Sequence, residues 1–358
     1  MNTVKKDIIN ILKGYFHSDY SFNIDSDLND ILDCSNSLSI GPIVGYALNK
    51  SDKYKTNIFD NTVFLAADRY ERQNSIRQEI INILNKNNIP YIFLKGHTLS
   101  KYYDEEYLRY STDIDILVNK NDYDLVKHIL VDKYSYKLII YKTNEFNVSK
   151  NSIVLDIQNK LTEDDEVVDK IYDDIIFDNT HELNNEYKYL FIITHAAKHL
   201  NTNYISIQFL LDLYYVNKLD LDREFINSKL KEIKLDRFNE VCLKTIGVLF
   251  NGADSDDTID SFIEYMFNTS GIENRILAHD GNNYIISRLF PDTKTMCLLY
   301  PSLTKCKLLL PFYYVKRLID RISMGRLNNA INEVKISNSV DNNEVIKTNE
   351  LFKKIGLR

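Results

Sequence analysis

Two aspartates, Asp113 and Asp115, are separated by a single residue at the start of an apolar segment that runs to Val118. In a β-strand, side chains two residues apart point to the same face, so both carboxylates would project side by side. Carboxylates this close repel each other, and their burial costs free energy unless a cation compensates. The pattern therefore indicates a site for a hard divalent ion such as Mg²⁺ or Mn²⁺, which prefers oxygen ligands.

A third carboxylate, Asp156, lies inside the apolar segment 153–157, which has the length and composition of another strand. A charged side chain in such a strand needs a partner. Three carboxylates can hold two metal ions, which clamp the attacking and leaving oxygens of a phosphoryl transfer. We therefore expect Asp156 to join Asp113 and Asp115 in one site.

A possible phosphate turn precedes this pair. Lys95 and Gly96 follow a short apolar strand, residues 91–94, and a helix is expected from His97 to about residue 108. Backbone N–H groups at such a helix start suit an anionic phosphate tail, and Lys95 adds a positive charge. Arg109, four residues before Asp113, supplies a second cation.

Both cations also have simpler interpretations. Lys95 could be a solvated residue at the end of a strand. Arg109 could form a surface ion pair, which contributes little to stability, with one of three nearby acidic residues, Asp104, Glu105 and Glu106. The Asp-x-Asp pairs at 25–27 and 254–256 lack an apolar strand, and a helix N-cap explains the first of these two better than a metal site.

The surrounding periodicity predicts an α/β unit with a mixed sheet. Its expected elements are helix 74–88, strand 91–94, helix 97–108, strand 113–118, helix 122–133, and strands 136–141 and 152–158. Helices are expected again at 189–200, 205–219 and 225–246. The fold class is α+β, with a helical N-terminal region (1–72), the α/β core (73–180), a helical C-terminal domain (181–330), and a last part (331–358). In that last part, residues 331–349 are expected to form a polar mobile segment before a terminal helix.

Four stretches together resemble one known family. LKG at 94–96, the pattern R-x-x-x-DIDILV at 109–118 and the later Asp156 resemble the uncharacterised bacterial nucleotidyltransferase family of the DNA-polymerase-β-like superfamily. HAAKH at 195–199 and LLD at 210–212 resemble the helical half of that family. The resemblance covers about residues 75–215 and implies a nucleotidyltransferase fold, with the site between the α/β core and the C-terminal helices.

The resemblance also implies an activity. A nucleoside monophosphate would pass from an NTP to an acceptor, pyrophosphate would be released, and Asp113, Asp115 and Asp156 would hold two Mg²⁺ (or Mn²⁺) ions. The residues expected to bind the nucleotide are Lys95, Gly96, His97, Arg109, His199 and Asp212. Two departures bear on nucleotide affinity and acceptor choice: His97 follows the glycine where the superfamily usually has serine, and Gln158 stands where the family often has histidine.

His195 and His199 are four residues apart and share one helix face. They could be a packed, hydrogen-bonded pair at the domain junction. Alternatively, one of them, or Asp212, contacts the nucleotide or acts as general base toward the acceptor. No glutamate follows His195 in the HExxH pattern of a zinc protease, so that class is not expected.

The acceptor is open at this point: it is a small molecule, or a Tyr, Ser or Thr of a peptide or protein. Two rival classes are a glycosyltransferase, which also uses Asp-x-Asp to hold a metal and a sugar nucleotide, and a non-catalytic relative that acts as a binding partner. In a glycosyltransferase, the Lys95-Gly96 turn and the strand carboxylate Asp156 would have no role.

The amino-acid composition argues against several classes of binding partner and fold. Lys+Arg 44 against Asp+Glu 51 gives a net charge of −7, which does not favour a broad nucleic-acid or anionic-membrane surface. Only 10 glycines and 5 prolines indicate long helices and exclude a β-sandwich. The four scattered cysteines favour reduced thiols, and the sequence shows neither a signal peptide nor a membrane span, so a cytoplasmic protein is expected.

Overall fold

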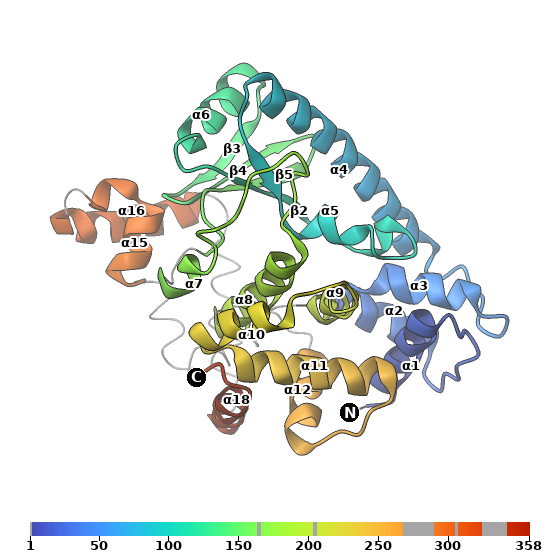
Figure 1. The fold of residues 1–358 in the computed structure, drawn as a ribbon. Coiled ribbons are helices and arrows are strands. Elements are labelled where there is room, and N and C mark those ends of the chain that lie inside the picture. Colours follow the sequence, from blue (N-terminus) through green and yellow to red (C-terminus); the bar gives the residue numbers. More distant parts are fainter. Residues whose placement is uncertain (1, 163–165, 203–205, 268–289, 305–306, 324–341) are drawn as a thin grey trace.

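The sheet that carries the predicted site stands between two groups of helices (Figure 1). The computed structural model describes residues 2–162, 166–202, 206–267, 290–304, 307–323 and 342–358. Within these ranges, a mixed five-stranded sheet is combined with helical N- and C-terminal regions. This confirms the predicted α+β class.

The strands are β1 (Tyr91–Phe93), β2 (Asp113–Val118), β3 (Lys137–Tyr141), β4 (Glu145–Lys150) and β5 (Ile153–Gln158). Their order in the sheet is β1-β2-β5-β4-β3, in which β2 and β5 are parallel and the other neighbours are antiparallel. The predicted strands are confirmed to within a residue at each end. Strand β4 was not predicted; it forms a hairpin with β5 through Asn151 and Ser152, which both have positive φ, as a type I′ turn requires.

One face of the sheet is apolar. The alternate residues Ile114, Ile116, Leu155 and Ile157 pack into a core with the helices α4 (Asp60–Lys86) and α6 (Tyr123–His128). A π-helical turn, Ile129–Lys133, continues α6. Helix α4 begins 14 residues before its predicted start, because its first half has few buried residues and so shows no apolar periodicity. It runs without interruption across residue 72, where the sequence suggested a boundary.

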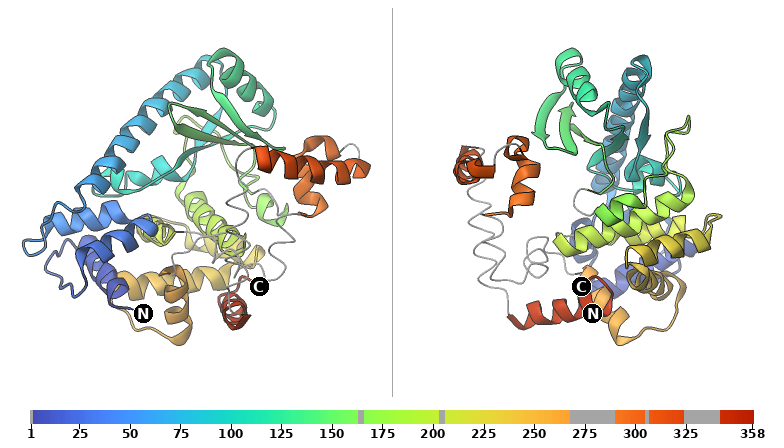
Figure 2. Two further views of the ribbon diagram at one scale, coloured as in Figure 1. Left: turned by 180° about the vertical axis from the view of Figure 1, so that it is seen from behind. Right: turned by 60° about the vertical axis from the view of Figure 1, so that its left-hand side comes forward.

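The opposite face of the sheet looks toward a helical body in which N-terminal and C-terminal helices share one hydrophobic core (Figure 2). The N-terminal helices are α1 (Thr3–His17), α2 (Leu28–Ser37) and α3 (Gly41–Lys50). The C-terminal helices are α8 (Asn185–Thr202), α9 (Gln208–Val216), α10 (Arg223–Glu232), α11 (Asp236–Asn251), α12 (Asp257–Phe267) and α18 (Asn342–Lys354). The face of the sheet that carries the predicted carboxylates is therefore opposite helices from both the N-terminal and the C-terminal region.

Besides the start of α4, three further predictions are wrong in extent. The helix expected at 97–108 is α5 (Lys95–Ser100) and a separate 3-10 turn, Glu106–Leu108. The helix expected at 225–246 is two helices, α10 and α11, because Lys234 between them adopts a positive φ. Residues 342–349, expected in a mobile segment, belong to α18; residues 331–341 lie outside the described ranges.

The remaining elements are short or lie apart from the sheet. They are α7 (Glu166–Lys170), α15 (Thr293–Leu299), α16 (Leu310–Ser323) and the 3-10 turns Pro301–Thr304 and Lys307–Leu309. Among the described helices, none has the length and apolarity that crossing a bilayer demands. Cys34, Cys242 and Cys297 are free thiols, as expected, whereas Cys306 lies outside the described ranges.

Candidate active site

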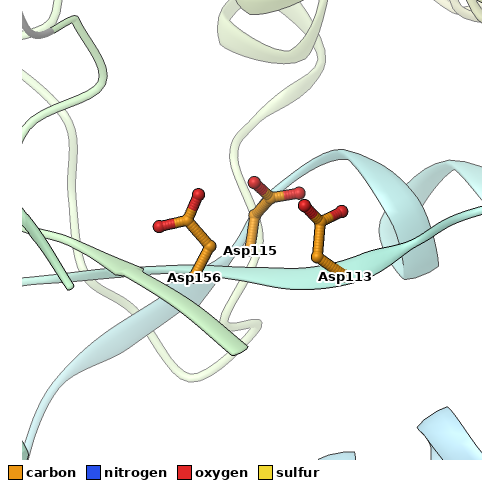
Figure 3. A group of neighbouring side chains, drawn as sticks. All are labelled: Asp113, Asp115 and Asp156. Carbon is orange, nitrogen blue, oxygen red and sulfur yellow. The ribbon is translucent and has the colours of Figure 1, made fainter. Parts of the chain in front are cut away.

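The three predicted carboxylates meet on the polar face of the sheet (Figure 3). Strands β2 and β5 are adjacent and parallel, and their register sets Asp115 directly beside Asp156. Asp113 lies two residues before Asp115 and therefore shares its face. Carboxylate oxygens of all three residues lie within 4.8 Å of one another. The strand pairing thus brings together residues that are more than forty positions apart.

This triad suits a divalent cation. Asp115 is 4% exposed, and the Oδ1 atom of Asp156 is buried with no hydrogen-bond partner. A buried carboxylate oxygen without a donor is costly, so the site is short of positive charge. An all-oxygen donor set of this kind fits Mg²⁺ or Mn²⁺. Among the described residues, no other group of three Asp, Glu, His or Cys side chains has this geometry.

Burial and mutual repulsion raise the pKa values of two of the three carboxyl groups. Burial, together with the neighbouring carboxylates Asp115 and Glu145, raises the pKa of Asp156 to about 8. Burial and Asp115 also raise the pKa of Asp113. Without a metal, Asp156 therefore retains its proton near neutral pH, which lowers the negative charge of the triad.

A pH dependence of stability follows for the metal-free protein. Between its ordinary pKa of 3.8 and the folded value of about 8, Asp156 is protonated in the folded chain and ionised in the unfolded chain. The free energy of unfolding should therefore fall as pH rises through this window, by about 1 kcal/mol per pH unit. Urea denaturation in EDTA at several pH values measures this slope. Asp156→Asn should flatten it, and an unchanged slope in that variant would contradict the assignment.

Lys95 forms an ion pair with the triad. Its Nζ lies 3.1 Å from Asp115 Oδ1, and its side chain is 23% exposed. Burial alone would lower the pKa of Lys95, but Asp115, Asp113 and Asp156 together raise it. The alternative of a solvated lysine at a strand end is therefore wrong. Its positive φ of 28° is a strained backbone conformation of the kind that recurs at functional sites.

Gly96 is a position of close approach. A Cβ atom built there would lie 3.0 Å from Ser111 Oγ and 3.7 Å from Arg109 Nη1. A side chain at this position would crowd Ser111 Oγ, because the segment before β2 comes close to the start of α5. Ser111 lies between Arg109 and Asp113, at a position that the sequence motif left unspecified, and its contact with this turn was not predicted.

The side chain of His97 does not line the cavity beside Lys95 and Gly96. Its ring stacks on Tyr70 of α4, with 6.0 Å between the ring centroids. Burial and the charge of Arg77 lower its pKa to about 4. His97 lines a small space of about 20 Å³ on the α4 side of α5, not the larger cavity beside Lys95. Gly96, Arg109, Asp113 and Asp115 line the same small space, and the predicted nucleotide contact of His97 stays a prediction.

A cavity of about 240 Å³ opens between the polar face of the sheet and the helical body. The α/β unit contributes Lys95, Gly96, Asp113 and Asp115, and the helices α8 and α9 contribute aromatic and polar side chains. The residues on the helical side that the sequence did not suggest include Phe191, Gln208 and Phe209. No local signal marks them, because each reads as an ordinary residue of an apolar helix.

Arg109 lies at the wall of this cavity and pairs with Asp212 of α9. Its Nε donates to Asp212 Oδ1 at 3.0 Å and its Nη2 to Oδ2 at 2.8 Å. The alternative of a surface pair with the acidic residues at 104–106 is therefore wrong. Tyr103, which the sequence did not single out, donates its hydroxyl to Asp212 Oδ1 at 2.8 Å.

The two histidines of α8 differ in their environments. Their rings are in contact, with centroids 4.2 Å apart, and His195 lines the cavity whereas His199 does not. Burial and the charge of nearby Lys95 hold the pKa of His195 well below its usual range. His195 is therefore a neutral imidazole at the cavity wall. The predicted nucleotide contact of His199 stays a prediction.

Comparison with known proteins points to one family. A family model described as an uncharacterised nucleotidyltransferase matches residues 25–251, which is more than half of the chain. The match begins just before α2, ends with α11 and includes the triad, Lys95, Arg109 and Asp212. A search of curated proteins found no match.

Proposed function

The chain belongs to the family of uncharacterised nucleotidyltransferases, and from this premise we propose that it moves a nucleoside monophosphate from an NTP to an acceptor in a reaction that requires a divalent metal. The observation that carries the proposal is the triad, in which Asp113, Asp115 and Asp156 share one face of two parallel strands. The buried, unpartnered Oδ1 of Asp156 supports a metal at this position.

In the proposed reaction, an acceptor oxygen forms a bond to the α-phosphorus of the NTP. The bond from that phosphorus to the bridging oxygen breaks, pyrophosphate leaves, and an acceptor hydroxyl gives up its proton. Asp113, Asp115 and Asp156 would hold Mg²⁺ or Mn²⁺, and Asp156 would help to take the acceptor proton. When bound, such ions supply charge stabilisation at the reacting phosphate and its oxygens.

The lining of the cavity suggests how the substrates are arranged. The cavity includes Asp113 and Asp115 but not Asp156. We therefore place the NTP in the cavity, with its β- and γ-phosphates near Lys95 and Gly96. The acceptor would approach from the side of Asp156. The Nζ of Lys95, held at the carboxylates by Asp115, offers a point charge to the phosphates.

The acceptor is a small molecule or a hydroxyl of a peptide or protein. A sugar nucleotide is a weaker candidate donor, because a glycosyltransferase would give no role to a third carboxylate in register with Asp115, or to Lys95 at the same site.

Label transfer from NTP tests the proposed reaction class. The full chain is incubated with Mg²⁺, a cell extract that supplies acceptors, and NTP labelled at either the α- or the γ-phosphate. We expect the α-label to enter a product and the γ-label to appear in pyrophosphate. Transfer of the γ-label to the product would identify a kinase and contradict the proposal. The mass of the labelled product separates a protein acceptor from a small molecule.

A further inference from the structure

A buried ion pair connects the two walls of the cavity. Arg109 belongs to the segment that leads into β2, and Asp212 belongs to α9 of the helical body. The side chains are 8% and 6% exposed, and the two parallel contacts of 3.0 and 2.8 Å form a bidentate pair. Such a geometry fixes the orientation of the guanidinium plane as well as its position.

Both oxygens of Asp212 are used by protein donors. Oδ1 accepts from Arg109 Nε and from the Tyr103 hydroxyl, and Oδ2 accepts from Arg109 Nη2. Tyr103 is itself 5% exposed and follows α5 closely in the chain. Asp212 lies at the cavity wall, and both of its carboxylate oxygens hold protein donors there.

The opposite edge of the guanidinium remains open. A guanidinium carries five N–H donors, and Asp212 takes one from Nε and one from Nη2. Within the described part of the chain, Nη1 has no hydrogen-bond partner. It lies 3.7 Å from where a Cβ of Gly96 would stand, at the turn where the cavity begins.

Stability alone does not account for this arrangement. A buried ion pair costs desolvation energy that its Coulomb attraction often only repays, so apolar residues of similar volume would hold the two walls together equally well. The pair is therefore better explained by its effect on the orientation of the Arg109 N–H groups that Asp212 does not bind. A bidentate fork with one open edge toward a cavity is suited to bind a phosphate oxygen.

We propose that Asp212 and Tyr103 are positioning residues, which hold the Arg109 fork so that Nη1 faces the Gly96 turn and binds a phosphate oxygen of the NTP. This inference rests on the proposed function and adds residues to it. It also makes α9 part of the phosphate subsite, because the helical body supplies the carboxylate that orients the cation.

A positioning role and a purely electrostatic role of Asp212 predict opposite effects of Asp212→Asn on phosphate binding. If Asp212 only neutralised Arg109, Asp212→Asn would leave more positive charge at the cavity and strengthen phosphate binding. If Asp212 orients Arg109, the same variant loses the fork geometry and weakens binding. We expect Asp212→Asn to weaken binding of magnesium tripolyphosphate about tenfold or more, and Tyr103→Phe about threefold to tenfold.

Calorimetric titration of the full chain with magnesium tripolyphosphate and with each NTP measures these changes. Tyr103→Phe keeps the ion pair, so this variant still tests the positioning role if Asp212→Asn does not fold. Its matched control is Tyr189→Phe, which removes a buried 2.7 Å hydrogen bond to Asn239 away from the cavity and should leave binding unchanged. In an Arg109→Lys background, Tyr103→Phe should have no further effect, because its action passes through the fork.

The outcomes separate this inference from the proposed function. If the wild-type protein binds these ligands and both variants bind them equally well or more tightly, the positioning role is wrong and the proposed function stands. An effect of Tyr103→Phe that persists in the Arg109→Lys background would also overturn the positioning role. If the wild-type protein binds neither tripolyphosphate nor any NTP, the proposed function fails and this inference fails with it.

Discussion

Asp115→Asn is expected to lower nucleotidyl transfer by about a thousandfold or more, because several kcal/mol of charge stabilisation at the reacting phosphate would be lost. Asp115 is the central member of the triad, beside Asp156 across the strand pair and two residues from Asp113. Asparagine has the same shape and keeps one oxygen, so the sheet should remain intact. Initial rates with saturating NTP and Mg²⁺ measure the effect, with circular dichroism to verify the fold.

A second Asp-x-Asp pair in the same chain provides the control for this variant. Asp25 precedes Asp27 by two residues, as Asp113 precedes Asp115, but it is exposed and lies in a loop before α2. Asp27 caps that helix by accepting from the backbone N–H of Asn29 at 2.8 Å, which confirms the cap interpretation. Asp25→Asn should therefore keep full activity. Equal activity of Asp115→Asn and Asp25→Asn would exclude a catalytic role for the triad.

Lys95→Met is expected to destabilise the metal-free protein by about 1–3 kcal/mol, less than for a fully buried charge pair because the Lys95 side chain is 23% exposed. The ammonium of Lys95 lies 3.1 Å from Asp115 and balances part of the charge of the triad. A bound metal would compensate the same carboxylates, so Mg²⁺ or Mn²⁺ should restore most of the lost stability. The metal-induced rise in melting temperature should therefore be larger in this variant than in the wild-type protein.

Lys188 supplies the matched control for Lys95. Its side chain is 8% exposed and pairs with Glu182 at 2.6 Å, but neither residue lines the cavity. Lys188→Met should also lower stability, and metal should not restore it. Thermal denaturation of both variants in EDTA and in Mg²⁺ gives the comparison. Similar metal responses of the two variants would show that Lys95 and the metal do not share the same carboxylates.

Local patterns identified the three carboxylates of the triad, but not the register that brings them together. The alternation from Asp113 to Val118 fixes which side chains share a face, and the apolar strand around Asp156 marks the third carboxylate. The register that sets Asp115 beside Asp156 is a tertiary property, although the family resemblance implied their proximity. The hairpin partner β4 was missed because its alternation of polar and apolar residues is short and its turn contains neither Gly nor Pro.

The sequence pattern could not predict the ion pair between Arg109 and Asp212. Arg109 and Asp212 are 103 residues apart, and several acidic residues lie closer to Arg109 in the chain. Sequence proximity favoured those neighbours, but the packing of α9 against the α/β unit brings Asp212 to the guanidinium instead. His97 shows the converse: it adjoins Gly96 in the chain, yet the turn of α5 directs its ring to Tyr70.

Calorimetric binding of ATP, GTP, CTP and UTP tests the central claim most directly. The wild-type protein and an Asp113→Ala/Asp115→Ala variant are titrated in the presence of Mg²⁺ and again in EDTA. We predict that at least one NTP binds the wild-type protein with Mg²⁺, and that binding is lost in EDTA and in the double variant. Absence of NTP binding to the folded wild-type protein with Mg²⁺, or equal binding by the double variant, would contradict a metal-dependent nucleotide site at the triad.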